Sequence, residues 1–131
     1  MIGIDIMEVK RMKKALKTNE KLLDRFLTGK EQDYVDLKSK GTAGKKYPAY
    51  LYSICGIFAS KEAILKALGI GITSGYGFLD IEITHNKFGA PIVNLSKKLQ
   101  AFCDERKIVG IEISISHDGE YTIAQAITKY V

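Results

Sequence analysis

Apolar side chains follow strand spacing at the start of the chain and helix spacing directly afterwards. Residues 1–7 (MIGIDIM) carry isoleucine at every second position, which is the period of a β-strand. Residues 9–17 carry apolar side chains three to four positions apart, so a helix should follow at once. A second, short helix is predicted over residues 21–26. Thr28 and Glu31 then have the spacing of a capping box, which predicts a helix that ends near Leu37.

The longest predicted helix covers residues 48–68. Its apolar positions are too continuous for a helix with one exposed side, so we expect most of it to be buried. Gly69 and Gly71 follow it, where a left-handed cap is expected.

The second half of the chain alternates apolar and polar residues in short runs. Residues 79–84 and 91–95 are predicted to form a hairpin, and Ser96 should cap a helix that runs to about Lys107. Residues 111–116 and 121–127 flank Asp118-Gly119, a strong hairpin turn signal.

These elements predict an α+β fold in which a small, mostly antiparallel sheet packs around one long central helix. A chain of 131 residues with 46% hydrophobic content suits a single domain, 1–131. The stretch 38–48 is polar and basic, as expected of a mobile loop. No apolar run approaches membrane-spanning length, and a signal peptide is not evident, so we expect a cytoplasmic protein without membrane insertion. Cys55 and Cys103 lack partners at metal-ligand spacing and are predicted to be buried thiols.

The net charge of +5 comes entirely from the first part of the chain. Residues 1–50 hold twelve basic and seven acidic side chains, whereas residues 51–131 hold eight of each. Residues 9–18 contain five basic side chains and no acid. This segment predicts an acidic partner, for which nucleic acid, an anionic membrane surface and an acidic protein all qualify; a solvated helix face without a partner is the alternative.

Three polar positions are candidates for chemistry. Asp5 lies among isoleucines in a predicted strand, where it needs either a cation or nearby backbone donors. Glu62 and Lys66 share a face of the long helix, so they form either a surface pair or, together with Lys61, a site for phosphate or a hard metal ion. His117 precedes the last turn, where it either forms a hydrogen bond with a neighbouring backbone group or belongs to a Ser/His nucleophilic pair; the second is disfavoured because the adjacent Ser116 points to the opposite face of the strand.

Six segments resemble the short class of 4′-phosphopantetheinyl transferases, the holo-acyl-carrier-protein synthases, in their order and spacing. The segments are GIDIMEVKRM (3–12), RFLTGKE (25–31), FASKEAILKALGIGI (58–72), LDIEI (79–83), KFGAPIV (87–93) and ISISHDGEYTIAQAI (113–127). The resemblance implies that the chain transfers the phosphopantetheine arm of coenzyme A to a serine of apo acyl carrier protein, a step of fatty acid and lipid biosynthesis. Adenosine 3′,5′-bisphosphate is the released product.

The resemblance also implies the roles of individual residues. Asp5 and Glu62 would bind Mg²⁺, a hard cation that takes few carboxylates and keeps water and phosphate oxygens as its other ligands. Glu62 or a bound water would relay the proton of the serine hydroxyl, and Lys66 would complement the charge of the diphosphate. The expected coenzyme A contacts are Lys61, Gly69, Gly71 and His117.

The basic segment acquires a specific partner from the same resemblance. Acyl carrier proteins are acidic, and the family docks them through basic residues after its first strand, so Arg11, Lys14 and Lys21 are the predicted contacts. The family is also trimeric, with active sites between subunits, so a homotrimer is expected.

One position departs from the family pattern. Ile57 stands where the family usually has a basic residue before the phenylalanine of the helix segment. Lys61 or a lysine of the 38–46 loop takes over the positive charge that is missing at this position, or the charge is not replaced.

Two other functions fit part of the sequence. An inactive, transferase-like interaction module would be compatible with Ile57. A small nucleic-acid-binding domain would use the lysine-rich segment, but it leaves Asp5, Glu62 and His117 unexplained, and no aromatic residues are interleaved with those lysines. We therefore expect no nucleic acid partner.

Overall fold

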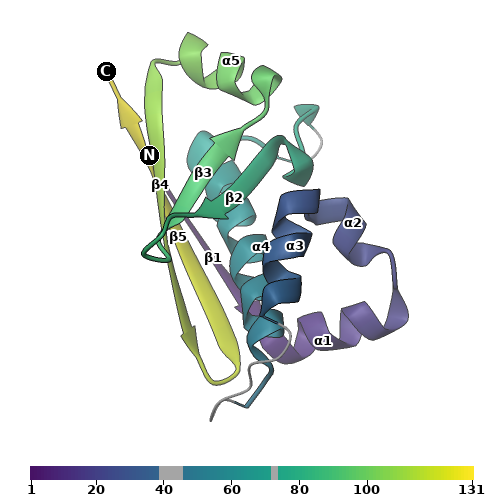
Figure 1. The fold of residues 1–131 in the computed structure, drawn as a ribbon. Coiled ribbons are helices and arrows are strands. Elements are labelled where there is room, and N and C mark those ends of the chain that lie inside the picture. Colours follow the sequence, from purple (N-terminus) through teal and green to yellow (C-terminus); the bar gives the residue numbers. More distant parts are fainter. Residues whose placement is uncertain (39–45, 72–73) are drawn as a thin grey trace.

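Helix α4 (Ala49–Leu68) lies between a sheet on one side and three shorter helices on the other (Figure 1). The structure, a computed structural model, describes residues 1–38, 46–71 and 74–131. The chain also forms helices α1 (Val9–Thr18), α2 (Leu22–Phe26), α3 (Gly29–Leu37) and α5 (Lys97–Glu105), strands β1 (Ile2–Glu8), β2 (Ile81–His85), β3 (Pro91–Leu95), β4 (Ile108–Asp118) and β5 (Tyr121–Tyr130), and a 3-10 turn, η2 (Phe78–Asp80).

The five strands form two antiparallel sheets. One has the order β1-β5-β4, and the other is the hairpin of β2 and β3. The predicted α+β class with a central helix is confirmed, but the strands are divided between two sheets where we expected one. Strand β3 contacts β4 without forming a hydrogen-bonded ladder with it.

The strand period of residues 1–7 is confirmed, and the isoleucines face away from α4. Ile2, Ile4 and Ile6 are 54–60% exposed, while Gly3 is buried and Asp5 half-buried on the face toward the helix. The neighbouring strand repeats this pattern, with alanines facing inward and isoleucines outward. Asp5 therefore lies in its sheet with small neighbours at the helix side, and the isoleucines do not surround its carboxylate.

Gly3 allows β1 to lie directly on the backbone of α4. A Cβ atom at this position would come within 2.0 Å of the carbonyl oxygen of Ala63 and 2.7 Å of the amide nitrogen of Ala67. Only glycine fits this approach, and it brings the next residues of β1 against the part of α4 that carries Glu62 and Lys66.

Most predicted element ends are confirmed. Thr28 and Glu31 form the expected capping box, and the Ser96 hydroxyl accepts a hydrogen bond from the amide of Leu99. Gly69 ends α4 with φ +71°, and Gly119 occupies the last hairpin turn with φ +54°.

The strand predicted from residue 79 begins at Ile81. Leu79 belongs to the 3-10 turn, which Asp80 stabilises by accepting a hydrogen bond from the amide of Gly77 and another from the hydroxyl of Ser96. A local side-chain cap therefore overrides the alternating pattern at this end.

The core forms around α4, most of which is buried as expected. Both cysteines are free and buried, as predicted, and burial raises the pKa of both thiols, that of Cys55 to about 12, which disfavours the thiolate form. Among the described residues, the helices include none that could cross a bilayer. Most of the predicted loop 38–48, residues 39–45, lies outside the described ranges.

Candidate active site

A hollow of about 440 Å³ collects residues from four elements beside the middle of α4. We call it the carboxylate hollow. It is lined by Asp5 of β1, Arg11 of α1, Leu22 and Phe26 of α2, and Glu62 and Lys66 of α4, among others. The structure therefore brings together two carboxylates and two cations that are up to 61 positions apart in the chain.

Lys66 connects the strand to the helix at this point. Its ammonium lies 3.3 Å from Oδ1 of Asp5 and donates to the carbonyl oxygen of Ile4 at 3.0 Å. In the part of the chain that the structure describes, β1 is an edge strand that pairs with β5 alone, so this carbonyl is available to a side chain. Lys66 is 55% exposed and remains accessible to an anion.

Glu62 faces Asp5 across the hollow. Burial raises the pKa of Glu62, the negative charge of Asp5 raises it further, and the ammonium of Lys66 opposes both effects. Two carboxylates near enough to repel each other on one half-buried surface are a donor set that a hard divalent cation stabilises. Asp5 and Glu62 therefore fit a Mg²⁺ site in which protein supplies two ligands. Among the described residues, clusters of three or more acidic, histidine or cysteine ligands are absent.

Lys61 does not lie in this hollow, and its predicted contact with a coenzyme A phosphate is not supported. Its side chain is fully buried, and its ammonium donates to Oε1 of Glu31 and to the carbonyl oxygen of Phe26, both at 2.6 Å. Burial lowers the pKa of Lys61, and the charge of Glu31 opposes that shift. A phosphate at the surface cannot reach this ammonium, so the missing charge at Ile57 is not supplied by Lys61.

The predicted docking residues do not line one common hollow. Arg11 lines the carboxylate hollow, and Lys21 is exposed just before α2, which forms the wall of the same hollow. Lys14 instead lines a separate groove along α1. Of the three predicted contacts, Arg11 alone lines the carboxylate hollow, and Lys14 and Lys21 lie outside its lining.

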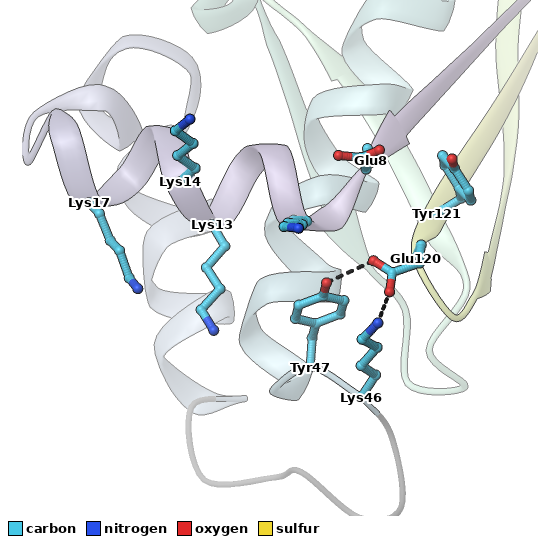
Figure 2. A pocket seen from close by; sticks show the side chains of 9 residues that line it. Glu8, Lys13, Lys14, Lys17, Lys46, Tyr47, Glu120 and Tyr121 are labelled. Atoms are coloured by element: carbon cyan, nitrogen blue, oxygen red, sulfur yellow. Dashed lines mark hydrogen bonds and ion pairs between the residues drawn. The ribbon is translucent and has the colours of Figure 1, made fainter.

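The second hollow, which we call the lysine groove, has a volume of about 770 Å³ and runs along α1. Its basic side chains are Lys10, Lys13, Lys14, Lys17 and Lys46. Figure 2 shows Lys13 and Lys17 extending to the side on which Tyr47 and Lys46 lie, and Lys14 extending away from them. Glu120 accepts a hydrogen bond from the hydroxyl of Tyr47 at 2.7 Å and pairs with Lys46 (Figure 2). These lysines do not converge on one point, as they would around a single phosphate.

His117 lies in a third hollow, of about 310 Å³, between α4, β4 and the β2–β3 hairpin; we call it the histidine hollow. Nδ1 of His117 shares a hydrogen bond of 2.8 Å with the hydroxyl of Thr122, and its ring contacts the edge of Tyr52. Ile57 also lines this hollow. The departure from the family pattern therefore removes a charge near His117 and leaves the carboxylates unaffected.

His117 and the glycines after α4 are far apart in one chain. His117 lies against Gly56, while Gly69 is thirteen residues further along the helix, about 20 Å at 1.5 Å per residue. The predicted phosphate contacts of His117, Gly69 and Gly71 are therefore not brought together within a single chain.

His85 and the apolar wall of the carboxylate hollow were not among the predicted site residues. His85 stacks on Tyr34 with 4.0 Å between ring centroids, and its Nδ1 is buried without a hydrogen-bond partner among the described residues. Burial, followed by the charge of Lys38, lowers the pKa of His85. Phe26 and Leu22 form a wall of the carboxylate hollow. Their sequence pattern is that of ordinary core residues, so no signal distinguishes them.

The chain matches a model of the 4′-phosphopantetheinyl transferase superfamily over residues 1–126. A holo-[acyl-carrier-protein] synthase of Thermoanaerobacter sp. (strain X514) is 44% identical over 96% of this chain and 84% of the relative. A holo-[acyl-carrier-protein] synthase of Clostridium botulinum (strain Eklund 17B / Type B) is 43% identical over 99% of this chain and 97% of the relative.

Solved structures of such synthases have the same fold. The Helicobacter pylori synthase in complex with coenzyme A superposes with a TM-score of 0.80 and 36% identity, covering 98% of this chain and 100% of the other. The Bacillus anthracis synthase in complex with CoA (3′,5′-ADP) gives a TM-score of 0.76 and 33% identity, covering 99% and 96%. On both the sequence and the fold, this chain belongs to the 4′-phosphopantetheinyl transferase superfamily, among the holo-[acyl-carrier-protein] synthases.

Proposed function

We propose that this enzyme transfers the 4′-phosphopantetheine group of coenzyme A to a serine of apo acyl carrier protein, with Mg²⁺, and releases adenosine 3′,5′-bisphosphate. The observation that carries the proposal is the pairing of Asp5 and Glu62 in one hollow with Lys66 beside them. Coenzyme A as the donor is supported by the bound ligands named for the Helicobacter and Bacillus synthases. The cytoplasmic location expected from the sequence stays a prediction.

Each residue of the hollow has a distinct part in this proposal. Asp5 and Glu62 would hold Mg²⁺, which when bound neutralises the diphosphate and polarises the phosphorus. Lys66 is exposed enough to complement the charge of the diphosphate. Glu62, or a water bound beside it, would take the proton of the serine hydroxyl.

The acceptor would dock beside this hollow. Arg11 at its rim and Lys21 next to its α2 wall offer positive charge to an acidic protein. Lys14 lies about one helical turn after Arg11 and lines the lysine groove, whose positive charge would add attraction at long range.

The coenzyme A site would be shared between subunits of a homotrimer. Within one chain the histidine hollow and the carboxylate hollow have no lining residue in common, and His117 is far from Gly69. The outer face of the three-stranded sheet supplies a surface for assembly, because it exposes Ile2, Ile4, Ile6, Ile123 and Ile127. A contiguous apolar face of this kind is typical of a protein interface.

A mass-spectrometric assay tests the reaction. The protein is incubated with coenzyme A, Mg²⁺ and an apo carrier protein, and the carrier should gain the mass of one phosphopantetheine group. Asp5→Asn and Glu62→Gln variants with unchanged circular dichroism should lose the activity. If the unaltered protein leaves several carrier proteins unmodified, the transferase proposal fails and the inactive interaction module is favoured. If the protein instead binds a nucleic acid probe at physiological salt, the nucleic-acid-binding alternative is favoured.

A further inference from the structure

A buried ion pair lies directly behind Glu62. Lys61, the preceding residue of α4, points into the protein, and both its side chain and that of Glu31 are fully buried. The ammonium of Lys61 donates to Oε1 of Glu31 and to the carbonyl oxygen of Phe26, each at 2.6 Å. The two acceptors belong to α3 and to the end of α2.

Glu31 extends this contact to two further segments. Its Oε1 also accepts the amide of Thr28 at 2.8 Å, and its Oε2 accepts the amide of Ile83 at 2.7 Å. The Thr28 hydroxyl in turn donates to Glu82 at 2.6 Å. One carboxylate therefore joins the α2–α3 connection, α4 and β2.

This network holds a wall of the carboxylate hollow. Phe26, whose carbonyl oxygen accepts a hydrogen bond from the Lys61 ammonium, lines the hollow, and Leu22 of the same short helix lines it as well. Helix α2 has only five residues, too few to hold its position by its own hydrogen bonds. The distance between α2 and Glu62 consequently depends on the contacts that hold α2 against α4, among them the hydrogen bond from Lys61 to Phe26.

Stability alone is a weak reason for such a pair. Two charges that leave water lose solvation comparable with their mutual attraction, so a buried ion pair is often no more stable than apolar residues of the same volume. Its directional hydrogen bonds, in contrast, specify one relative position of the groups they join.

We infer that Lys61 and Glu31 are positioning residues. They fix the position of α2, which begins at Leu22 directly after Lys21, relative to Glu62. This position determines where the acidic acceptor docks beside the carboxylates. This inference rests on the proposed function. The pair touches no substrate and acts through the wall that it anchors.

The test compares the unaltered protein with a Lys61→Met/Glu31→Gln double variant. Methionine keeps the length of the lysine stem, and glutamine keeps an acceptor for a backbone amide, so neither charge is left alone in the core. Lys61→Met by itself leaves the buried Glu31 carboxylate without its cation, and this single variant would fail to fold. A Lys97→Met/Glu105→Gln variant makes the same two chemical changes on exposed positions of α5 and serves as the control.

The measurements are steady-state kinetics for both substrates and amide hydrogen exchange by mass spectrometry without Mg²⁺. In the double variant, kcat/KM for the carrier should fall about 10- to 100-fold, as expected when reacting groups are displaced by about an ångström. KM for coenzyme A should stay within about twofold, because His117 and Lys66 are not in contact with the network. Exchange should accelerate in residues 22–31 and stay unchanged in 49–68, and the control should match the unaltered protein.

Two outcomes overturn the inference. The first is a double variant whose kinetics and amide exchange equal those of the unaltered protein. The second is faster exchange throughout the chain with an equal fall in kcat/KM for both substrates, which indicates a loss of stability only. If the unaltered protein modifies no carrier, the proposed function fails on its own. The exchange experiment then decides whether the pair anchors α2, since local acceleration supports the anchor and unchanged exchange refutes it.

Discussion

At the scale of single residues, the site depends on the different surroundings of chemically similar groups. Asp5 is paired with Lys66, whereas Glu62 is half-buried beside the charge of Asp5. Lys66 is exposed, whereas Lys61, only five residues earlier on the same helix, is fully buried. Successive residues of a helix are turned by about 100°, so Lys61 and Lys66, five residues apart, point in directions about 140° apart around α4, one into the protein and one to the surface.

The raised pKa of Glu62 predicts a pH-dependent cost to stability. Without a divalent ion, ionised Glu62 is less favourable in the folded chain than in the unfolded one. The cost is absent below the ordinary value of 4.5 and complete above the raised pKa. Glu62→Gln should therefore raise Tm at about pH 7.5 and leave it unchanged at about pH 4 in EDTA. Equal Tm differences at the two pH values, measured by calorimetry, would contradict this assignment.

The two faces of α1 predict different effects of charge reversal. Arg11→Glu, at the carboxylate hollow, should raise KM for the carrier about tenfold at low salt, and less at high salt, with a smaller change in kcat. Lys14→Glu, in the lysine groove, should raise it by a factor of about two to three. Lys97→Glu on α5 is the matched control. An Arg11→Glu variant whose carrier KM equals that of the control would refute docking at this rim.

At the scale of elements, the site exists because β1 and α4 touch through their backbones. Gly3 leaves no room for a side chain against Ala63 and Ala67, and Lys66 then reaches the carbonyl of Ile4. The edge position of β1 and the small residues of α4 therefore bring Asp5 to Glu62.

Gly3→Ala should be strongly destabilising. Its Cβ would lie 2.0 Å from backbone that cannot shift without moving a whole helix, so a loss of about 3 kcal/mol, or about 10 °C in Tm, is expected. Gly29→Ala, at the first position of α3 with no atom within 4 Å of the new Cβ, is the control and should be neutral or slightly stabilising. Thermal unfolding measures both variants, and similar Tm values would show that β1 does not require this approach.

At the scale of the whole molecule, the three-stranded sheet packs one face on α4, and its other face exposes isoleucines that none of the described residues cover. Ile127 and its neighbours on β1 are about half exposed, which a folded chain tolerates best when another subunit covers them. His117 and Glu62 lie in different hollows of one chain. A second subunit bound to this face could therefore complete the proposed coenzyme A site.

Ile127→Arg should therefore convert a trimer to monomers. Light scattering after gel filtration should give three times the mass of one chain for the unaltered protein and a single-chain mass for the variant, with unchanged circular dichroism and strongly reduced transfer. Leu37→Arg, at an exposed apolar position outside the sheet, should remain trimeric. A monomeric unaltered protein with full activity would exclude the shared site.

The sequence determined much of this protein by itself. Local signals, such as the Thr28–Glu31 capping box, the Gly69 cap and the Asp118-Gly119 turn, specify element ends because their hydrogen bonds join residues close in the chain. The ordered set of motifs determined the family. It also predicted Asp5, Glu62 and Lys66 as one group, which the fold brings into one hollow.

Only the tertiary structure decided where the other charges lie. Nothing local distinguishes Lys61 from Lys66, and Lys61 is buried because α3 supplies Glu31 from thirty residues away. The division of α1 into two faces, and the distance of His117 from Gly69, likewise depend on which elements pack beside α4. Burial and charge pairing arise from segments distant in the chain, so residue type and spacing cannot reveal them.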